Sequence, residues 1–232
     1  MFDGVDDRLA ALVERHGLAA GAGRRLRLLL DLVADAPISL SAVRDLATAA
    51  DVHAADSLSA LELPEIRAAR TLADLGSGGG FPGLPLAIAL PGTAVTLIES
   101  SSKKCAFLRD AGSRMGLDNV RVVDARVEQW AQGRGTQDVV CARAVAPLGV
   151  LVEYAAPLLV LGGHLVAWKA NPGVEELRGA SQAAPLVGMA PTRVVAARPF
   201  GDVRRSLHIY QSLSSAPKHY PRRPGMARKR PL

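Results

Sequence analysis

Cysteine is scarce in this sequence. Only Cys105 and Cys141 occur among 232 residues, and neither has a second Cys or a His at the spacing of a metal site. Two isolated cysteines are too few for the disulfide framework of a small secreted protein. We therefore expect both to be packed, structural thiols, and we expect no bound metal.

A long unbroken hydrophobic run is also missing. The longest uncharged stretch, residues 75–98, is interrupted by six glycines and three prolines, which argues against a membrane-spanning helix. The N-terminus carries Asp3, Asp6 and Asp7, whereas a secretory signal begins with basic residues. We expect a cytoplasmic protein with no membrane partner.

Acidic residues are absent from residues 218–232, which hold six of the 28 Lys and Arg residues. The remaining 22 basic residues balance the 22 acidic ones, so the net charge of +6 resides in this tail. A basic tail on a neutral body suggests an arm that contacts a polyanion, because Lys and Arg release counterions when they bind phosphates. A disordered, solubilising tail is the alternative.

Residues 1–65 have the apolar periodicity of helices. Ser39 or Ser41 can cap one of them, and Asp56 can cap another, so we expect His53 and Asp56 to serve structure through a cap and a local hydrogen bond. Pro64 is expected to end this helical region. The predicted helices lie near residues 5–13, 26–33, 39–50 and 56–61.

Beyond residue 65, short apolar runs alternate with helix-sized segments, which predicts an α/β fold with a mostly parallel sheet and an antiparallel finish. The chain then divides into a helical extension (1–65), a Rossmann-like core (66–213) and a basic tail (214–232). The predicted strands are 71–75, 94–98, 120–123, 138–141, 164–168, 192–197 and 204–211. The predicted helices of the core are 84–90, 102–115, 127–131, 147–159 and 174–183.

A glycine-rich loop follows the first predicted strand, where such folds bind nucleosides. One pattern, Gly78-x-Gly80-x-x-Gly83, fits the fingerprint of an NAD-binding oxidoreductase. The other, Asp74-x-Gly76-x-Gly78-x-Gly80, puts an acid at the end of the strand. A carboxylate there would repel a pyrophosphate, whereas it attracts the sulfonium and amino groups of S-adenosylmethionine. We therefore favour S-adenosylmethionine, with Asp74, Gly76 and Gly78 as binding residues.

A second acid, Glu99, ends the second predicted strand. A carboxylate at this position can bind both ribose hydroxyls of a nucleoside. Both cofactor classes use such an acid, so Glu99 indicates a nucleoside without choosing between them.

Five stretches carry a family pattern: 53–58, the loop 74–85 with its Pro-Gly-Leu-Pro ending, 103–109, 141–144, and the tail 218–222 with its basic Tyr-Pro-Arg ending. In these the chain resembles the ribosomal RNA small subunit methyltransferase G family, also called the glucose-inhibited division protein B family. The resemblance implies a Rossmann-like S-adenosylmethionine-dependent methyltransferase fold that acts on 16S ribosomal RNA in the small ribosomal subunit, and we expect a monomer.

The resemblance also assigns site residues. It implies that Gly76 and Phe81 contact the cofactor and that Val127 and Glu128 flank its adenine. Arg143 would face both cofactor and methyl-transfer site, and Lys169 would lie in the same pocket; these two are the candidate catalytic residues. Other roles for them are a salt bridge from Arg143 to an acid such as Asp124, and a solvated strand end for Lys169.

The implied reaction is methylation at N7 of guanine 527 in the 530 loop of 16S ribosomal RNA. N7 carries an in-plane lone pair and no proton, so in-line transfer needs positioning but no general base. The sequence lacks the Asp/Asn-Pro-Pro-aromatic box for exocyclic amines and a prolyl-cysteine nucleophile. Alternative functions are a methyltransferase acting on another RNA, a protein or a small molecule, an NAD-dependent oxidoreductase, and a non-catalytic RNA-binding module.

Overall fold

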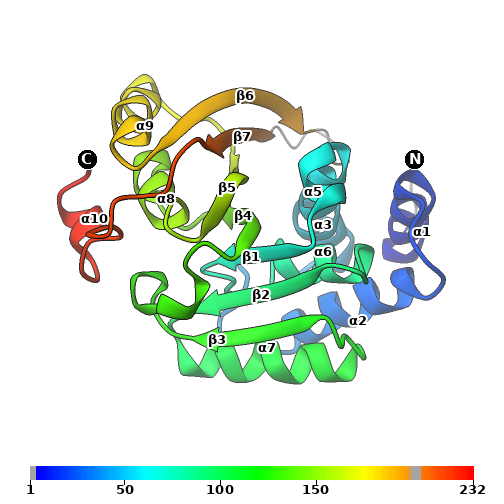
Figure 1. The fold of residues 1–232 in the computed structure, drawn as a ribbon. Helices are drawn as coiled ribbons and strands as arrows, with labels where there is room; N and C mark the ends of the chain where they lie inside the picture. Colours follow the sequence, from blue (N-terminus) through cyan, green and yellow to red (C-terminus); the bar gives the residue numbers. More distant parts are fainter. Residues whose placement is uncertain (1–3, 198, 200–204) are drawn as a thin grey trace.

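The computed structural model describes residues 4–197, 199 and 205–232. Its centre is a seven-stranded sheet of order β3-β2-β1-β4-β5-β7-β6 (Figure 1). The first five strands in this order are parallel, and β7 is antiparallel to both β5 and β6, so the predicted mixed sheet is confirmed. The strands are β1 (Thr71–Leu75), β2 (Ala94–Glu99), β3 (Val120–Asp124), β4 (Gln137–Arg143), β5 (Leu159–Lys169), β6 (Met189–Ala197) and β7 (Arg205–Ser212). Arg204, the predicted start of the last strand, lies outside the described residues.

Helices cover both faces of the sheet, because successive side chains of each strand point to opposite faces. One face, which includes Leu72 and Leu97, packs in a single hydrophobic core with the N-terminal helices, α6 and α7. The other face, which includes Ala73 and Leu75, packs against α8, α9 and residues of the C-terminal segment. The core helices are α6 (Gly83–Ala89), α7 (Ser102–Arg114), α8 (Leu148–Ala155) and α9 (Val174–Leu186), and two 3₁₀ turns, Val127–Gln129 and Ala131–Gly133, follow β3.

The N-terminal region is helical, but its details differ from the prediction. The helix expected at residues 39–50 begins only at Leu46, because the Asp45 carboxylate, rather than a serine, caps it by accepting a 2.7 Å hydrogen bond from Thr48 N. Pro64 starts a helix instead of ending the region. The elements are α1 (Val5–His16), α2 (Ala22–Ala34), α3 (Leu46–Ala49), a π-helical turn (Ala50–Ala55), α4 (Asp56–Leu58), a 3₁₀ turn (Ser59–Glu62) and α5 (Pro64–Ala68).

Asp56 is not an N-cap, contrary to the prediction. It lies inside the continuous helical run that the π-helical turn joins, and its side chain is fully buried. Its carboxylate instead pairs with Arg143 at the end of β4. The helical extension thus reaches the carboxyl edge of the sheet with a charged group.

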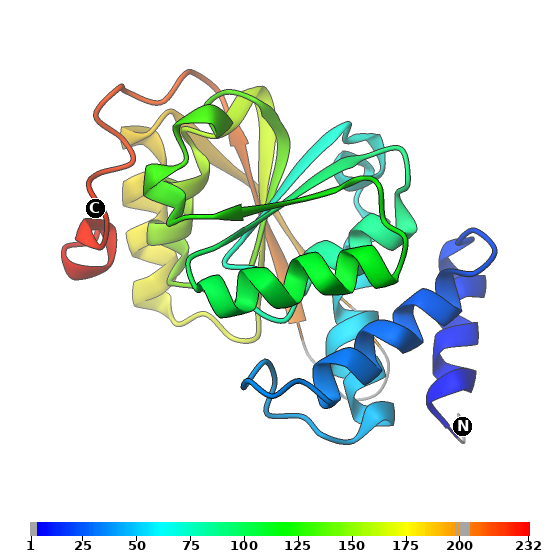
Figure 2. The same ribbon diagram turned by 90° about the horizontal axis from the view of Figure 1, so that it is seen from below.

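The C-terminal segment packs against the body rather than extending from it as an arm. Tyr220 and Ala227 are buried, and Arg222 pairs with the buried carboxylate of Glu153 on α8. The segment ends in the short helix α10 (Met226–Lys229), on the side of the sheet opposite to the N-terminal helices (Figure 2). Five of its six cations remain exposed: Lys218, Arg223, Arg228, Lys229 and Arg230. The division of the chain at residues 65 and 213 stays a prediction, and the first boundary falls within α5.

Candidate functional site

The glycine loop after β1 follows the acid-x-Gly-x-Gly-x-Gly register. Gly76, Gly78 and Gly80 all have positive φ, which only glycine adopts without strain, whereas Gly83 opens α6 with an ordinary φ. Gly76 N donates to Ile98 O at 2.8 Å, which ties the loop to β2. A Cβ on Gly83 would lie 2.8 Å from Asp74 Oδ2, so that glycine serves close packing.

Asp74 lies beneath this loop and is fully buried. Its Oδ2 accepts a 3.1 Å hydrogen bond from Gly83 N, and its Oδ1 has no partner among the described residues. Burial raises the pKa of this carboxyl to about 7, because the charged form has lost its water. An unpartnered carboxylate oxygen under a ligand-binding loop is costly to bury, and a cationic group nearby would relieve that cost.

Glu99 at the end of β2 holds the same loop from the side. Its Oε2 accepts from Gly78 N at 3.1 Å, and its Oε1 accepts from Ser100 N and Ser101 N at 2.8 and 2.9 Å. A carboxylate offers about four acceptor positions, so these bonds leave about one. Binding two ribose hydroxyls through Glu99 therefore requires it to exchange at least the bond from Gly78.

Two clefts flank the turn that follows β4 at the carboxyl edge of the sheet. The first, the Gly76 cleft, brings Gly76, Val127 and Glu128 together. Four predicted cofactor residues do not line this cleft: Gly78 and Phe81 of the loop, Asp74 beneath the loop and Glu99 beside it. The Gly76 cleft is lined by Leu75, Gly76, Ile98, Ser100, Ala125, Arg126, Val127, Glu128, Val145, Tyr154 and Arg228.

The second, the Arg143 cleft, has a volume of about 560 Å³ and brings together the two candidate catalytic residues, Arg143 and Lys169. Arg143 and Ala144 line it, whereas Val145, the next residue, lines the Gly76 cleft. Ala144 between them has φ +58°, a strained conformation for a side chain-bearing residue. The turn therefore points consecutive residues into the two clefts. The Arg143 cleft is lined by Val43, Val52, His53, Asp56, Arg143, Ala144, Trp168, Lys169, Ala170 and Arg205.

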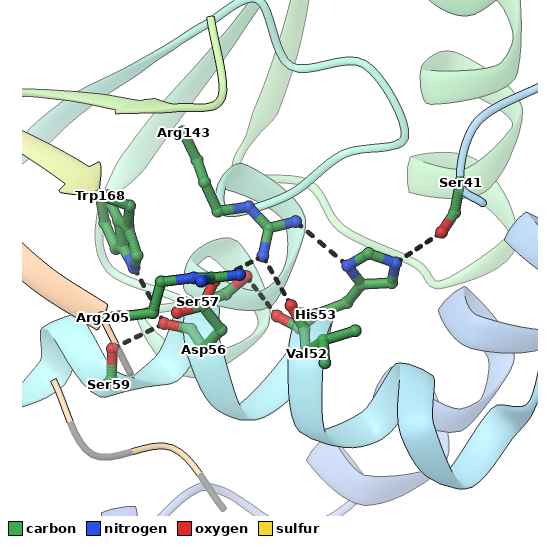
Figure 3. A network of polar contacts seen from close by, with 9 residues as sticks. All are labelled: Ser41, Val52, His53, Asp56, Ser57, Ser59, Arg143, Trp168 and Arg205. Atoms are coloured by element: carbon green, nitrogen blue, oxygen red, sulfur yellow. Dashed lines mark hydrogen bonds and ion pairs between the residues drawn. The ribbon is translucent and has the colours of Figure 1, made fainter. Parts of the chain in front are cut away.

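Arg143 is the hub of a polar network that links β4 to the N-terminal extension (Figure 3). Its Nη1 donates to Val52 O and to Asp56 Oδ2, both at 2.9 Å, and its Nη2 lies 3.3 Å from His53 Nδ1. The guanidinium also sits 5.5 Å from the ring centre of Phe81. Three of its five N–H groups are thus used, which leaves two for a ligand. The acid that pairs with Arg143 is Asp56, and not Asp124.

His53 is held in its neutral form by this network. Burial, followed by the charge of Arg143, lowers the pKa of His53 to about 4. Nδ1 must accept from the guanidinium, so the ring proton is on Nε2, which lies 2.7 Å from Ser41 Oγ. The ring stacks on Phe81 with centroids 4.7 Å apart. Phe81, from the glycine loop, thereby contacts the wall of the Arg143 cleft.

Lys169 at the end of β5 is not a solvated strand end. Its Nζ donates to Ala146 O at 2.8 Å and pairs with Glu176, whose Oε1 also accepts from Leu148 N. The ammonium is therefore directed at the same turn after β4, with a charge balanced by Glu176 from α9.

Several residues of these clefts escaped the sequence reasoning. The i, i+3 spacing of His53 and Asp56 was a signal that both share one helix face, but nothing local indicated that the face meets Arg143. Arg205 of β7 lies 3.6 Å from the same Asp56 carboxylate. For Arg228, the sequence offered only the positive charge of the residue and no motif that would place it in a cleft.

Neither cysteine is placed for chemistry. Both are buried, and burial raises the pKa of Cys105 to about 11 and that of Cys141 well above its usual value. Within the described ranges, no three His, Cys, Asp or Glu side chains cluster as metal ligands. Among the described residues, none of the helices has both the length and the hydrophobicity of a membrane span.

Comparison with known proteins agrees with this architecture. Residues 25–207 match the family model of rRNA small subunit methyltransferase G. A ribosomal RNA small subunit methyltransferase G of Rubrobacter xylanophilus is 46% identical over 187 residues, which cover 78% of this chain and 72% of the relative.

Two solved methyltransferases share the fold. A predicted O-methyltransferase of Agrobacterium tumefaciens has a TM-score of 0.54 at 22% identity, covering 70% of this chain and 82% of that one. A SAM-dependent methyltransferase of Aquifex aeolicus has a TM-score of 0.50 at 16% identity, covering 62% and 82%. The fold is the Rossmann-like fold of these enzymes, and the methyl donor is S-adenosylmethionine. The chain belongs to the ribosomal RNA small subunit methyltransferase G family.

Proposed function

We propose that this ribosomal RNA methyltransferase transfers a methyl group to N7 of guanine 527, in the 530 loop of 16S ribosomal RNA. The observation that supports the proposal most is the turn after β4, which points Arg143 into one cleft and Val145 into the other. A donor in the Gly76 cleft and a base in the Arg143 cleft would meet at this turn. We further propose that the enzyme is a cytoplasmic monomer acting on the small ribosomal subunit.

The chemistry of the Arg143 cleft suits a nucleophile that carries no proton. His53, with a pKa of about 4, is too weak a base near neutral pH, and Asp56 is committed to Arg143. Lys169 is paired with Glu176. Guanine N7 needs none of them as a base, whereas the two remaining N–H groups of Arg143 match the O6 edge of guanine or a phosphate. Arg143 and Lys169 would then position the base and balance phosphate charge.

The cofactor is proposed to lie along the Gly76 cleft. Val127 and Glu128 would flank the adenine, Glu99 would take the ribose, and Gly76 and Gly78 would let the backbone approach the methionyl group. Asp74, beneath the loop, would favour the sulfonium and amino group by charge rather than by direct contact, since it is fully buried. Phe81 would shape the boundary between donor and acceptor.

The test is transfer of tritiated methyl from S-adenosylmethionine to small ribosomal subunits that lack the modification. Borohydride and aniline cleave RNA at N7-methylguanine, so we expect label in 16S RNA and a cleavage in the 530 loop. Fully modified subunits are the control and should accept no label. Label elsewhere in RNA, or in a ribosomal protein, would contradict the target and leave the cofactor assignment standing.

The raised pKa of Asp74 leads us to expect that cofactor binding depends on pH. A cation bound nearby favours the carboxylate, so below a pKa of about 7 binding must release a proton from Asp74. The ratio of the S-adenosylmethionine affinity of the wild type to that of Asp74→Asn should therefore rise by roughly tenfold from pH 6 to pH 8. The ratio cancels titration of the ligand's amino group. Calorimetry at three pH values measures it, and a flat ratio would make Asp74 purely structural.

A further inference from the structure

The C-terminal segment is anchored to the body at three points around the Gly76 cleft. Arg222 forms a forked ion pair with Glu153, which is 1% exposed on α8. Arg134 Nη1 donates to Tyr220 O at 2.6 Å. Gly225 N donates to Glu128 Oε1 at 2.9 Å, so the segment touches a residue of the cleft directly. A paired buried carboxylate holds its partner strongly, because releasing it leaves an uncompensated charge.

With the segment held at these points, one cation of the tail, Arg228, lies in the Gly76 cleft. Arg228 lines the Gly76 cleft, and its Nη2 donates to Val145 O at 2.9 Å. Val145 borders Gly76 so closely that a Cβ on that glycine would lie 2.9 Å from Val145 Cγ2. Arg228 therefore reaches the Gly76 side of the cleft through Val145, and it also lies beside Tyr154, which interacts with Glu128. The bond to Val145 O uses one of the five N–H donors of the guanidinium.

The position of Arg228 matches one group of the cofactor. If the adenine lies at Val127 and Glu128, the methionyl group must lie at the other end, toward Gly76 and the turn that leads to Arg143. The methionyl group ends in a carboxylate, the one anionic group of S-adenosylmethionine. A guanidinium binds a carboxylate through two parallel hydrogen bonds, which makes it the matching partner.

We propose that the C-terminal segment is a wall of the cofactor site and that Arg228 binds the methionyl carboxylate of S-adenosylmethionine. This inference rests on the cofactor placement proposed above. It assigns the basic tail a role in binding the methyl donor, whereas its composition alone suggested contact with a polyanion or a solubilising role.

The test compares two ligands that differ in the amino-acid portion. S-adenosylhomocysteine carries the carboxylate, and 5′-methylthioadenosine lacks it. By calorimetry on the full chain, Arg228→Ala should weaken S-adenosylhomocysteine binding by about tenfold or more, the range of a charge-assisted hydrogen bond, and change methylthioadenosine binding by less than about twofold. Arg228→Lys should restore part of the loss, because it restores the charge without the fork.

Two matched variants control for charge. Lys229 and Arg230 follow Arg228 directly, are exposed and do not line the cleft. Lys229→Ala and Arg230→Ala should leave both affinities within about twofold. Normal binding of S-adenosylhomocysteine by Arg228→Ala would overturn the inference. The same holds if this variant loses affinity for the ribosomal subunit alone, because Arg228 would then contact RNA and not the cofactor. Unchanged binding of both ligands by Val127→Asp would instead overturn the cofactor placement.

Discussion

Arg143→Ala should lower the rate of methyl transfer to small ribosomal subunits by about a hundredfold or more, while S-adenosylhomocysteine affinity changes only a few-fold. The guanidinium lines the acceptor cleft, and its two remaining N–H groups are the best-placed donors to fix the base. A single-turnover assay measures the rate of the chemical step, and calorimetry measures cofactor affinity. Equal losses in both would place Arg143 in the cofactor site instead of the acceptor site.

The same variant should also lose stability, because Asp56 is fully buried and would lose its closest cation. Removing one partner of a buried pair costs about 3–5 kcal/mol, and Arg205, 3.6 Å from Asp56, would offset part of that. Urea denaturation measures this cost. Asp56→Asn is the matched control, since the amide oxygen still accepts from Arg143 Nη1. It should keep most of the transfer rate, and a loss equal to that of Arg143→Ala would make the pair a structural element only.

Arg143→Lys distinguishes geometry from charge. The forked guanidinium bonds Val52 O, Asp56 and His53 at once, which a single ammonium cannot reproduce. We therefore expect the lysine variant to recover stability more than it recovers the transfer rate.

The strands and the glycine loop were predictable because their signals are local. β1 has the predicted limits, and β2 and β3 exceed theirs by one residue, since short apolar runs that end near an acid mark these strands within a few positions. The signal is weaker for β5, which begins at Leu159, five residues before its predicted start at 164. The helix near residue 46 was misplaced because Ser39, Ser41 and Asp45 all have the chemistry of a cap, and only packing selects Asp45. Ser41 is instead used by His53.

The side-chain contacts between distant elements were not predictable, because they depend on the topology of the fold. Arg143 meets Asp56 across 87 positions of sequence. The acid named from the sequence was Asp124, which is nearer along the chain, but it ends β3, and β2 and β1 lie between β3 and β4. The tail gives the same lesson. Its charge suggested an outward arm, whereas its contacts with Glu153, Glu128 and Val145 fold it onto the body. Composition gives the charge of a segment, but it does not show which acidic residue of the fold each cation contacts.

Gly80→Ala should strongly destabilise the glycine loop. Gly80 has φ +93°, and a Cβ there would overlap the Leu84 side chain and lie 3.3 Å from Leu108 Cδ2. Both leucines are fully buried, so neither can move into solvent. Backbone strain of about 1–2 kcal/mol and overpacking of about 1–3 kcal/mol act together. We expect a loss of roughly 3 kcal/mol in the free energy of unfolding, and we expect cofactor affinity to fall with it because the loop must shift.

Gly79→Ala, one position earlier, is the matched control. Gly79 does not have a positive φ, and a Cβ on it would meet Leu40 at 3.4 Å, an ordinary contact. Its free energy of unfolding should change by less than about 1 kcal/mol, with S-adenosylhomocysteine affinity close to that of the wild type. Urea denaturation and calorimetry on both variants measure the contrast. Equal effects at the two positions would mean that the loop is not held by the packing of Gly80 on Leu84, and that its glycines tolerate side chains in the bound conformation.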